Sequence, residues 1–355
     1  MTAHLNFASD NVWGASAPVL RALVEANEGP AAAYGADDVT AAVERQFSEL
    51  FEREVAVFLV ATGTAANALA LAACLDPWGL CLCHEEAHVL EDECGAPEFF
   101  AHGAKLAGLP GPAGKLDASR LSDRLASLPT SVKQMPPQAL SISQATEAGT
   151  IYQLDEIAAL AAVCRERSLS LHMDGARFAN ALVALGATPA AMTWRAGVDI
   201  LSFGATKNGA LAAEAVVVFD PALAESLAYR RKRAGQTLSK GRLLSAQFKG
   251  YLDGDHWLEN ARHANAAALR LSAGLSRLPG VRIAWPTEAN EVFAILPATL
   301  DAALRQAGAF YHPWSTGSLA AGERIGPDEA LVRLVTSFAT SEGAVTQLLA
   351  AASAN

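Results

Sequence analysis

Lys207 is a lysine in a setting where an amine could do chemistry. It lies in the segment DILSFGATKNGALAAEAVVVF, residues 199–219, between two apolar runs that are typical of buried strands. A buried ammonium group costs free energy unless it is paired or neutralised, and burial lowers the pKa of a lysine so that its amine becomes an available nucleophile. The glycines nearby could instead form a surface turn with a solvated lysine. The segment alone favours that turn.

Two further groups of polar residues follow apolar runs. The segment TGTAAN, residues 62–67, comes directly after VAVFLV and opens a helical pattern. Glycine allows a ligand to approach the backbone, and free N–H groups at a helix start bind phosphate, although an ordinary capped turn fits about as well. Asp174 ends the run LSLHMD, where it could cap the next helix and pair with Arg177, or hold a cofactor.

Taken together, these residues match the needs of pyridoxal 5′-phosphate. That cofactor requires a lysine for a Schiff base, a carboxylate that keeps the pyridine nitrogen protonated, and a cradle for the phosphate. Asp174 and Lys207 stand at successive strand ends, one helix–strand unit apart, and the glycine turn stands at an earlier one. The residues therefore indicate a pyridoxal phosphate enzyme.

Two more strand ends carry polar side chains that could face such a cofactor. His88 follows the run LCLCH and could place its ring on the cofactor, or be a surface or satisfied core residue. Glu147 follows the run ALSIS, where its loop could reach the substrate or simply be solvated. The residues alone leave both alternatives open.

Apolar runs and helical patterns must position these side chains. Most of the runs are apolar on both faces, which is typical of central strands in a mostly parallel sheet covered by helices. Amphipathic patterns such as residues 154–167 separate them, so the sequence predicts an α/β fold with ligands at the carboxyl ends of the strands. The predicted strands are Val55–Val60, Leu80–His84, Ala139–Ser143, Leu169–Asp174, Val198–Phe203 and Ala215–Phe219.

The composition changes near Gly250. A long helical pattern over residues 256–278 is followed by the apolar runs VRIAW, NEVFAIL and LVRLVTSF. We therefore predict a large α/β domain over residues 1–250, which includes the N-terminal segment, and a smaller α+β domain over residues 251–355.

Bulk composition excludes several classes of partner. The chain of 355 residues is 51% hydrophobic and has a formal net charge of 27 − 37 = −10, which argues against nucleic acid and anionic membranes. Its five cysteines lack zinc-site spacing and are expected to be free thiols in a reducing compartment. With neither a signal pattern nor a spanning apolar run, we expect a soluble cytoplasmic protein.

Three longer motifs resemble those of the low-specificity L-threonine aldolases, which are fold-type I pyridoxal phosphate enzymes. They are SISQATEAGTIY at residues 141–152, LHMDGARFANAL at 171–182 and LSFGATKNG at 201–209. The resemblance runs from FASDN near the start to LVRLVTSFAT near the end. It implies a mostly parallel seven-stranded sheet, a smaller C-terminal domain, and a homotetramer built as a dimer of dimers.

The resemblance also implies roles for individual residues. Lys207 would carry the internal aldimine, Asp174 would pair with the pyridine nitrogen, and His88 would stack on the ring and assist at the substrate hydroxyl. Glu147 stands where other branches have a histidine, so the catalytic base stays open between Glu147, His88 and water. Gly63 and Thr64 would hold the phosphate of the cofactor. The amino acid carboxylate would be bound by Ser9, Arg177 and Arg333, with Arg177 also beside the cofactor. Tyr34 would reach into the site from a neighbouring subunit.

The activity implied is that of a lyase. A β-hydroxy-α-amino acid such as L-threonine or L-allo-threonine would be cleaved to glycine and an aldehyde, with no metal. The alternatives are β-elimination or transamination on the same fold and, in a different class, a non-catalytic α/β binding protein.

Overall fold

A seven-stranded sheet forms the centre of the protein. The computed structural model describes residues 5–319 and 322–354. The strand order is β1-β7-β6-β5-β4-β2-β3, and β7 alone runs against the others. The carboxyl ends of six strands and the amino end of β7 therefore share one edge. The strands are β1 Ala56–Val60, β2 Leu80–His84, β3 Lys105–Leu109, β4 Pro137–Ser143, β5 Ser170–Gly175, β6 Ile200–Gly204 and β7 Glu214–Val218.

Both faces of this sheet are buried, as the apolar runs predict. Val216 and Val218 pack on the side of helix α3, Gly63–Cys74, whereas Val217 and Phe203 face the opposite core. Successive side chains of a strand point to opposite faces, so a run that is apolar throughout is required here. The helices of the second face are α2 Asp38–Leu50, α7 Leu154–Glu166, α8 Phe178–Leu185 and α12 Arg242–Leu252.

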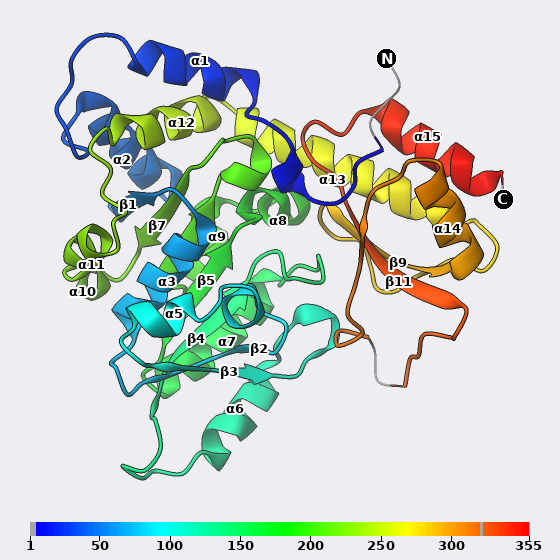
Figure 1. The fold of residues 1–355 in the computed structure, drawn as a ribbon. Helices are drawn as coiled ribbons and strands as arrows, with labels where there is room; N and C mark the ends of the chain where they lie inside the picture. Colours follow the sequence, from blue (N-terminus) through cyan, green and yellow to red (C-terminus); the bar gives the residue numbers. More distant parts are fainter. Residues whose placement is uncertain (1–4, 320–321, 355) are drawn as a thin grey trace.

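A second, antiparallel sheet of four strands has the order β10-β11-β9-β8. It packs against the later part of helix α13 and against α14 and α15, on the right of Figure 1. Leu5 and Phe7 join this second core, while Trp257 at the start of α13 packs in the first. The elements are β8 Arg282–Ile283, β9 Glu291–Pro297, β10 His312–Pro313, β11 Glu329–Val335, α13 His256–Leu275, α14 Ala298–Gln306 and α15 Glu342–Ser353.

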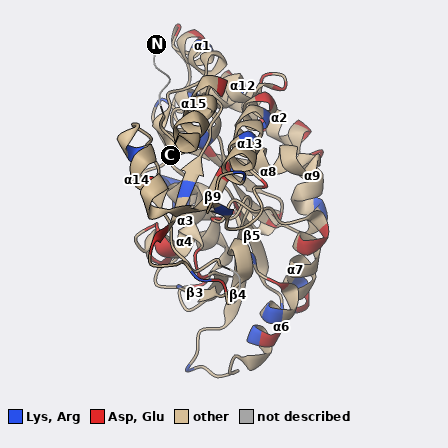
Figure 2. Ribbon diagram, turned by 90° about the vertical axis from the view of Figure 1, so that its right-hand side faces the viewer, with Lys and Arg blue, Asp and Glu red and all other residues tan. Residues whose placement is uncertain are grey.

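The remaining helices are short and lie mostly at the surface. Acidic and basic residues mix along α6 and α7 (Figure 2), which agrees with a chain that lacks a basic footprint. Within residues 5–319 and 322–354, no helix combines the length and the apolar character needed to cross a membrane. These helices are α1 Ala17–Ala26, α4 His88–Glu91, α5 Ala96–Phe100, α6 Ala118–Ser127, α9 Pro189–Met192, α10 Pro221–Ala224 and α11 Leu227–Arg233, with 3₁₀ turns at Asp10–Val12, Pro112–Gly114, Trp194–Ala196 and Thr206–Asn208.

All six predicted strands are present, and their ends differ from the prediction by at most two residues; Leu80–His84 matches at both ends. In the seven-stranded sheet, the strand missing from the prediction is β3, KLAGL, at the edge, where Lys105 and Gly108 are exposed and interrupt the apolar pattern. The predicted division at residue 250 stays a prediction, since α13 contributes to both cores.

Candidate active site

A pocket of about 380 Å³ opens at the edge where the strand ends meet. We call it the Lys207 pocket. Six of the residues that the sequence analysis singled out line it, and they come from five separate segments of the chain. These are Gly63, Thr64, His88, Glu147, Asp174 and Lys207.

Hydrogen bonds of Asn208 and close packing at Gly209 fix the turn that carries Lys207. The side chain of Asn208 donates hydrogen bonds to Tyr251 Oη and to the Trp257 carbonyl, both at 2.8 Å. Gly209 has φ +120°, a conformation that side chains rarely adopt, and a Cβ there would lie 2.8 Å from Asn260 Nδ2. Lys207 itself is half-buried and, among the described residues, forms no ion pair within 4.0 Å. The turn thus holds an amine at the pocket.

Asp174 is the penultimate residue of β5 and is buried. Its Oδ1 accepts from the backbone N–H of Ala176 at 2.9 Å, and its Oδ2 accepts from Asn67 Nδ2 at 2.8 Å. Below it, the ring of His172 contacts Ser141 Oγ at 2.9 Å and Ser202 Oγ at 3.0 Å, which ties β4, β5 and β6 together. Burial lowers the pKa of His172 to about 4. A neutral histidine therefore supports the strands beneath the carboxylate.

The start of helix α3 faces the pocket with open space above it. Thr62 caps the helix, since its hydroxyl accepts from the N–H of Ala65 at 3.1 Å. A Cβ built on Gly63 would meet no atom within 4 Å, so a side chain there would occupy free space over the helix start. The first N–H groups of a helix lack intrahelical acceptors and favour an anion. The predicted cradle therefore has both the donors and the room.

His88 begins helix α4 and contacts a carboxylate that the sequence analysis missed. Its Nδ1 lies 2.9 Å from Oε1 of Glu93, a buried residue. This hydrogen bond raises the pKa of His88, against the effect of burial. Burial in turn raises the pKa of Glu93. Glu147 is half-buried in the loop after β4, and the residue bonded to His88 is Glu93 rather than Glu147.

Arg177 and Arg333 meet buried carboxylates. Arg177 Nε lies 2.9 Å from Asp10 Oδ2 and its Nη2 lies 3.1 Å from Asp10 Oδ1, while Nη2 is 3.3 Å from Glu291 Oε1. Arg333 Nη1 is 3.8 Å from the same Glu291 oxygen. Ser9 precedes Asp10, and its hydroxyl lies 3.5 Å from Asp10 Oδ1. Asp10 and Glu291 therefore connect Ser9, Arg177 and Arg333. The guanidinium of Arg177 is already bound to Asp10.

Tyr34 lies away from the Lys207 pocket. The residue is 57% exposed, and Lys232 Nζ lies 4.8 Å from the centroid of its ring. It lines a separate cavity together with Thr40 and Arg231. Within one chain, Tyr34 is therefore not brought together with Lys207.

Glu214 is a further charged residue in the segment that holds Lys207, and the sequence analysis overlooked it. It begins β7 between Val60 of β1 and Gly204 of β6, and it lines the Lys207 pocket. Burial raises its pKa to about 7, while Thr206 and Lys207 act in the opposite direction. The signal was available, because a carboxylate at the head of the apolar run AVVVF raises the same question as Lys207.

The sheet and the residues at its edge define an α/β enzyme of fold type I. The family model described as beta-eliminating lyase matches residues 6–299. The low specificity L-threonine aldolase of Pseudomonas aeruginosa is 46% identical over 87% of this chain and 89% of its own length. The chain therefore belongs to the low-specificity L-threonine aldolases within the beta-eliminating lyase family, and it is a lyase.

Solved structures agree in fold. The threonine aldolase of Leishmania major has a TM-score of 0.90 and 30% identity, with 98% of each chain covered. A pyridoxal phosphate-bound putative aminotransferase from Clostridium difficile has a TM-score of 0.69 at 12% identity, over 96% of this chain and 90% of its own, and shows the shared fold. The family, the fold class and the lyase activity implied by the sequence motifs are confirmed.

Proposed function

We propose that the protein cleaves L-threonine, L-allo-threonine and related β-hydroxy-α-amino acids to glycine and an aldehyde, with pyridoxal 5′-phosphate in the Lys207 pocket. The observation that carries this proposal is the convergence of Lys207, Asp174 and the open start of α3 around one cavity. An amine, a carboxylate and an anion site are the donor set that this cofactor needs.

The residues present fit the cofactor. The space over Gly63 is open, the half-buried Lys207 has no ion-pair partner within the described residues, and Asp174 is held by two hydrogen bonds. When bound, the cofactor supplies an aldehyde that links covalently to amines and a ring that accepts the electrons of a broken Cα–Cβ bond. We assign the covalent link to Lys207, the ring nitrogen to Asp174, and the phosphate to Gly63 and Thr64.

We assign the proton steps to polar side chains that line the same pocket as Lys207. We assign the β-hydroxyl proton of the substrate to His88, whose side chain is 33% exposed in the pocket. A histidine suits proton transfer near neutral pH because its two forms are close in free energy there. Glu147 also lines the pocket, and we assign it a smaller role in orienting the substrate hydroxyl or a water.

The substrate carboxylate is assigned to the cluster of Ser9, Arg177 and Arg333. The side chain of Arg333 is 16% exposed, so its guanidinium supplies an accessible positive charge at this cluster. Arg177 is engaged by Asp10 and contributes through its charge and by fixing that neighbourhood. Clamping the carboxylate would fix the orientation of the substrate in the pocket, and orientation of this kind accounts for a large part of a rate enhancement.

We also propose a cytoplasmic homotetramer assembled as a dimer of dimers. The exposed ring of Tyr34 is then available to complete the Lys207 pocket of a neighbouring copy. Exposed apolar side chains near the pocket, Val12 and Leu211, fit a covered surface. The free state of all five cysteines fits a reducing compartment.

A product assay tests the function. Purified protein with pyridoxal phosphate and L-threonine is expected to release glycine and acetaldehyde in equal amounts. Release of a 2-oxo acid with ammonia would instead indicate β-elimination, and a 2-oxo acid with an aminated cofactor would indicate transamination. The enzyme is expected to show a visible absorption band that borohydride bleaches. If the protein shows no such band, it is a binding protein and not this enzyme.

A further inference from the structure

Four polar residues form an unbroken chain along one wall of the Lys207 pocket. His88 Nδ1 lies 2.9 Å from Glu93 Oε1, Asn67 Nδ2 lies 2.8 Å from the same oxygen, and Asn67 Nδ2 also lies 2.8 Å from Asp174 Oδ2. All four residues line the pocket. These hydrogen bonds therefore connect His88, the proposed proton-transfer residue, to Asp174, the proposed partner of the cofactor ring.

Asn67 holds two carboxylates close to each other. Its amide nitrogen carries two hydrogens, and each of them is directed to a different carboxylate oxygen at 2.8 Å. Asn67 and Glu93 are both buried, and they come from α3 and from the segment after α4. Two buried carboxylates repel each other, so a neutral double donor between them is needed to keep both in place.

We propose that Asn67 and Glu93 are positioning residues of the aldol cleavage, which orient His88 with Nδ1 bound to Glu93 and Nε2 available to the substrate. An ionised carboxylate only accepts hydrogen bonds, so Nδ1 of His88 must carry the hydrogen. Neutral His88 then presents Nε2 as an acceptor, the form that a general base requires. Among the described residues, Nε2 of His88 has no hydrogen-bond partner.

The electrostatics of the wall support this assignment, which rests on the proposed function. The hydrogen bond that His88 donates to Glu93 raises the pKa of His88, and the charges of Asp174 and Glu147 act in the same direction, whereas burial and Lys207 lower it. Glu93 is the largest of these influences. A carboxylate behind the imidazole makes it a stronger base and stabilises the imidazolium that forms when it takes a proton.

Histidine NMR titration provides a readout that packing alone would not move. His88 is assigned by the loss of its signal in His88→Phe, and its titration is followed in the protein purified with pyridoxal phosphate. In Glu93→Gln, which keeps the shape and removes the charge, the titration midpoint of His88 is expected to fall. The control is Glu91→Gln, which changes an exposed carboxylate at the end of helix α4, the helix that begins with His88. It is expected to leave the titration midpoint of His88 unchanged. An unchanged midpoint in Glu93→Gln, or equal shifts in both variants, would overturn the proposal.

Kinetics test whether the two positioning residues act together. Glu93→Gln is expected to lower kcat/KM for threonine by about tenfold to a hundredfold and to move its acid limb to lower pH. The double variant Asn67→Ala/Glu93→Gln is expected to be no slower than the slower single variant, because residues of one unit are not additive. Additive losses would show that Asn67 acts independently of Glu93.

The two proposals fail in different ways. The titration requires no turnover, so a protein that shows the His88 shift but releases no aldehyde would contradict the proposed function alone. A protein that releases aldehyde and shows no shift would contradict the positioning roles alone.

Discussion

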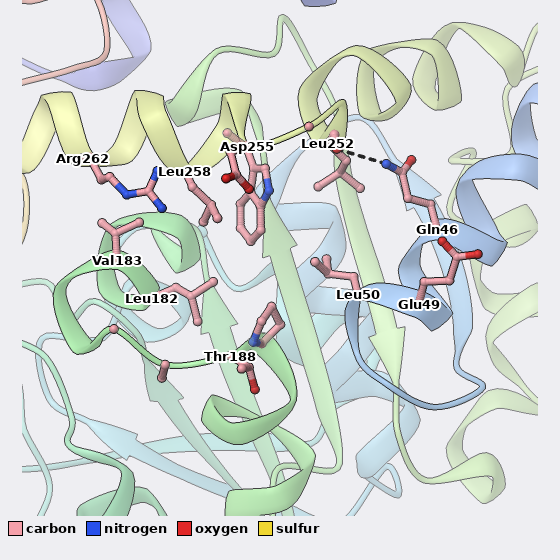
Figure 3. Close-up of a pocket in the computed structure, with 15 residues that line it drawn as sticks. Gln46, Glu49, Leu50, Leu182, Val183, Thr188, Leu252, Asp255, Leu258 and Arg262 are labelled. Carbon is pink, nitrogen blue, oxygen red and sulfur yellow. Dashed lines mark hydrogen bonds between the residues drawn. The ribbon is translucent and has the colours of Figure 1, made fainter.

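Two pockets of this protein differ in size and in what their walls contain. The pocket in Figure 3 has a volume of about 590 Å³ and is lined by side chains of α2, α8 and the start of α13, including Leu50, Leu182 and Arg262. We call it the helix pocket. The Lys207 pocket has about 380 Å³. In the helix pocket the polar contact drawn in Figure 3 runs from Gln46 to the Leu252 carbonyl, at 3.1 Å, and concerns only the scaffold.

The comparison shows that the candidate catalytic groups gather at the ends of the strands and not in the larger of these two pockets. In the Lys207 pocket, three titratable groups have displaced pKa values with identifiable causes, namely His88, Glu93 and Glu214. Parallel strands lie about 4.8 Å apart, so residues at their ends converge even when they are distant in sequence. Such a cluster of perturbed groups in a cleft marks a functional site.

The largest expected effect is that of Lys207→Ala. Without the amine, the protein cannot form the covalent link to the cofactor, so the visible band and nearly all turnover are expected to disappear. Absorbance spectra and glycine release measure this. Lys249→Ala, which removes an exposed lysine, is the control and should behave as the wild type. Retention of both the band and the activity in Lys207→Ala would refute the assignment.

Asp174→Asn is expected to cost rate more than cofactor affinity. An amide cannot stabilise the charge on the pyridine nitrogen, so the loss falls on the transition state. We expect kcat to fall about a hundredfold or more, a loss of about 2.7 kcal/mol. Single-turnover kinetics and cofactor titration separate the two quantities. If kcat stayed within a few-fold with cofactor bound, Asp174 would not be the ring partner.

His88→Phe is expected to preserve ring stacking and to slow cleavage by about a hundredfold, within the range typical of general acid–base groups. Glu147→Gln should have a smaller effect, seen mainly in the discrimination between L-threonine and L-allo-threonine. Steady-state kinetics with both substrates compare the two variants. The reverse order of severity would mean that His88 only stacks and that Glu147 carries the proton.

Glu214→Gln is expected to change how stability depends on pH. Burial raises the pKa of Glu214 from 4.5 to about 7, so between these values the folded protein binds more protons than the unfolded chain. The free energy of unfolding of the wild type therefore falls as pH rises through this window, by about 3 kcal/mol at most. The Tm of the variant without cofactor should rise relative to wild type from about pH 5 to about pH 8. Glu225→Gln, at an exposed site, should show no such trend; a constant Tm difference for Glu214→Gln would contradict the raised pKa.

The smallest effect is expected in the helix pocket. Arg262 is exposed there, and Arg262→Ala should leave kcat/KM within about twofold and the free energy of unfolding within about 0.5 kcal/mol. Kinetics and thermal unfolding check both. A loss comparable to that of His88→Phe would remove the distinction between the two pockets.

Some parts of this protein were determined by the local sequence. The six predicted strands were predictable because strands that are buried on both faces are mostly apolar, and AVVVF is apolar throughout. The lysine turn, the aspartate at a strand end and the helix-capping glycine turn were predictable because each depends on residues adjacent in the chain. The edge strand β3 was not, because it is exposed and its pattern is interrupted.

Only the tertiary structure decided which side chains bond to one another. Asn67 contacts Glu93 across 26 positions and Asp174 across 107, and Arg177 reaches Asp10 across 167. No local propensity encodes such pairs, since they depend on strand order and on how α3 and the N-terminal segment pack. The sequence therefore determined which residues stand at the strand ends, and the fold decided that Asn67 contacts both Glu93 and Asp174 and that Asp10 binds Arg177.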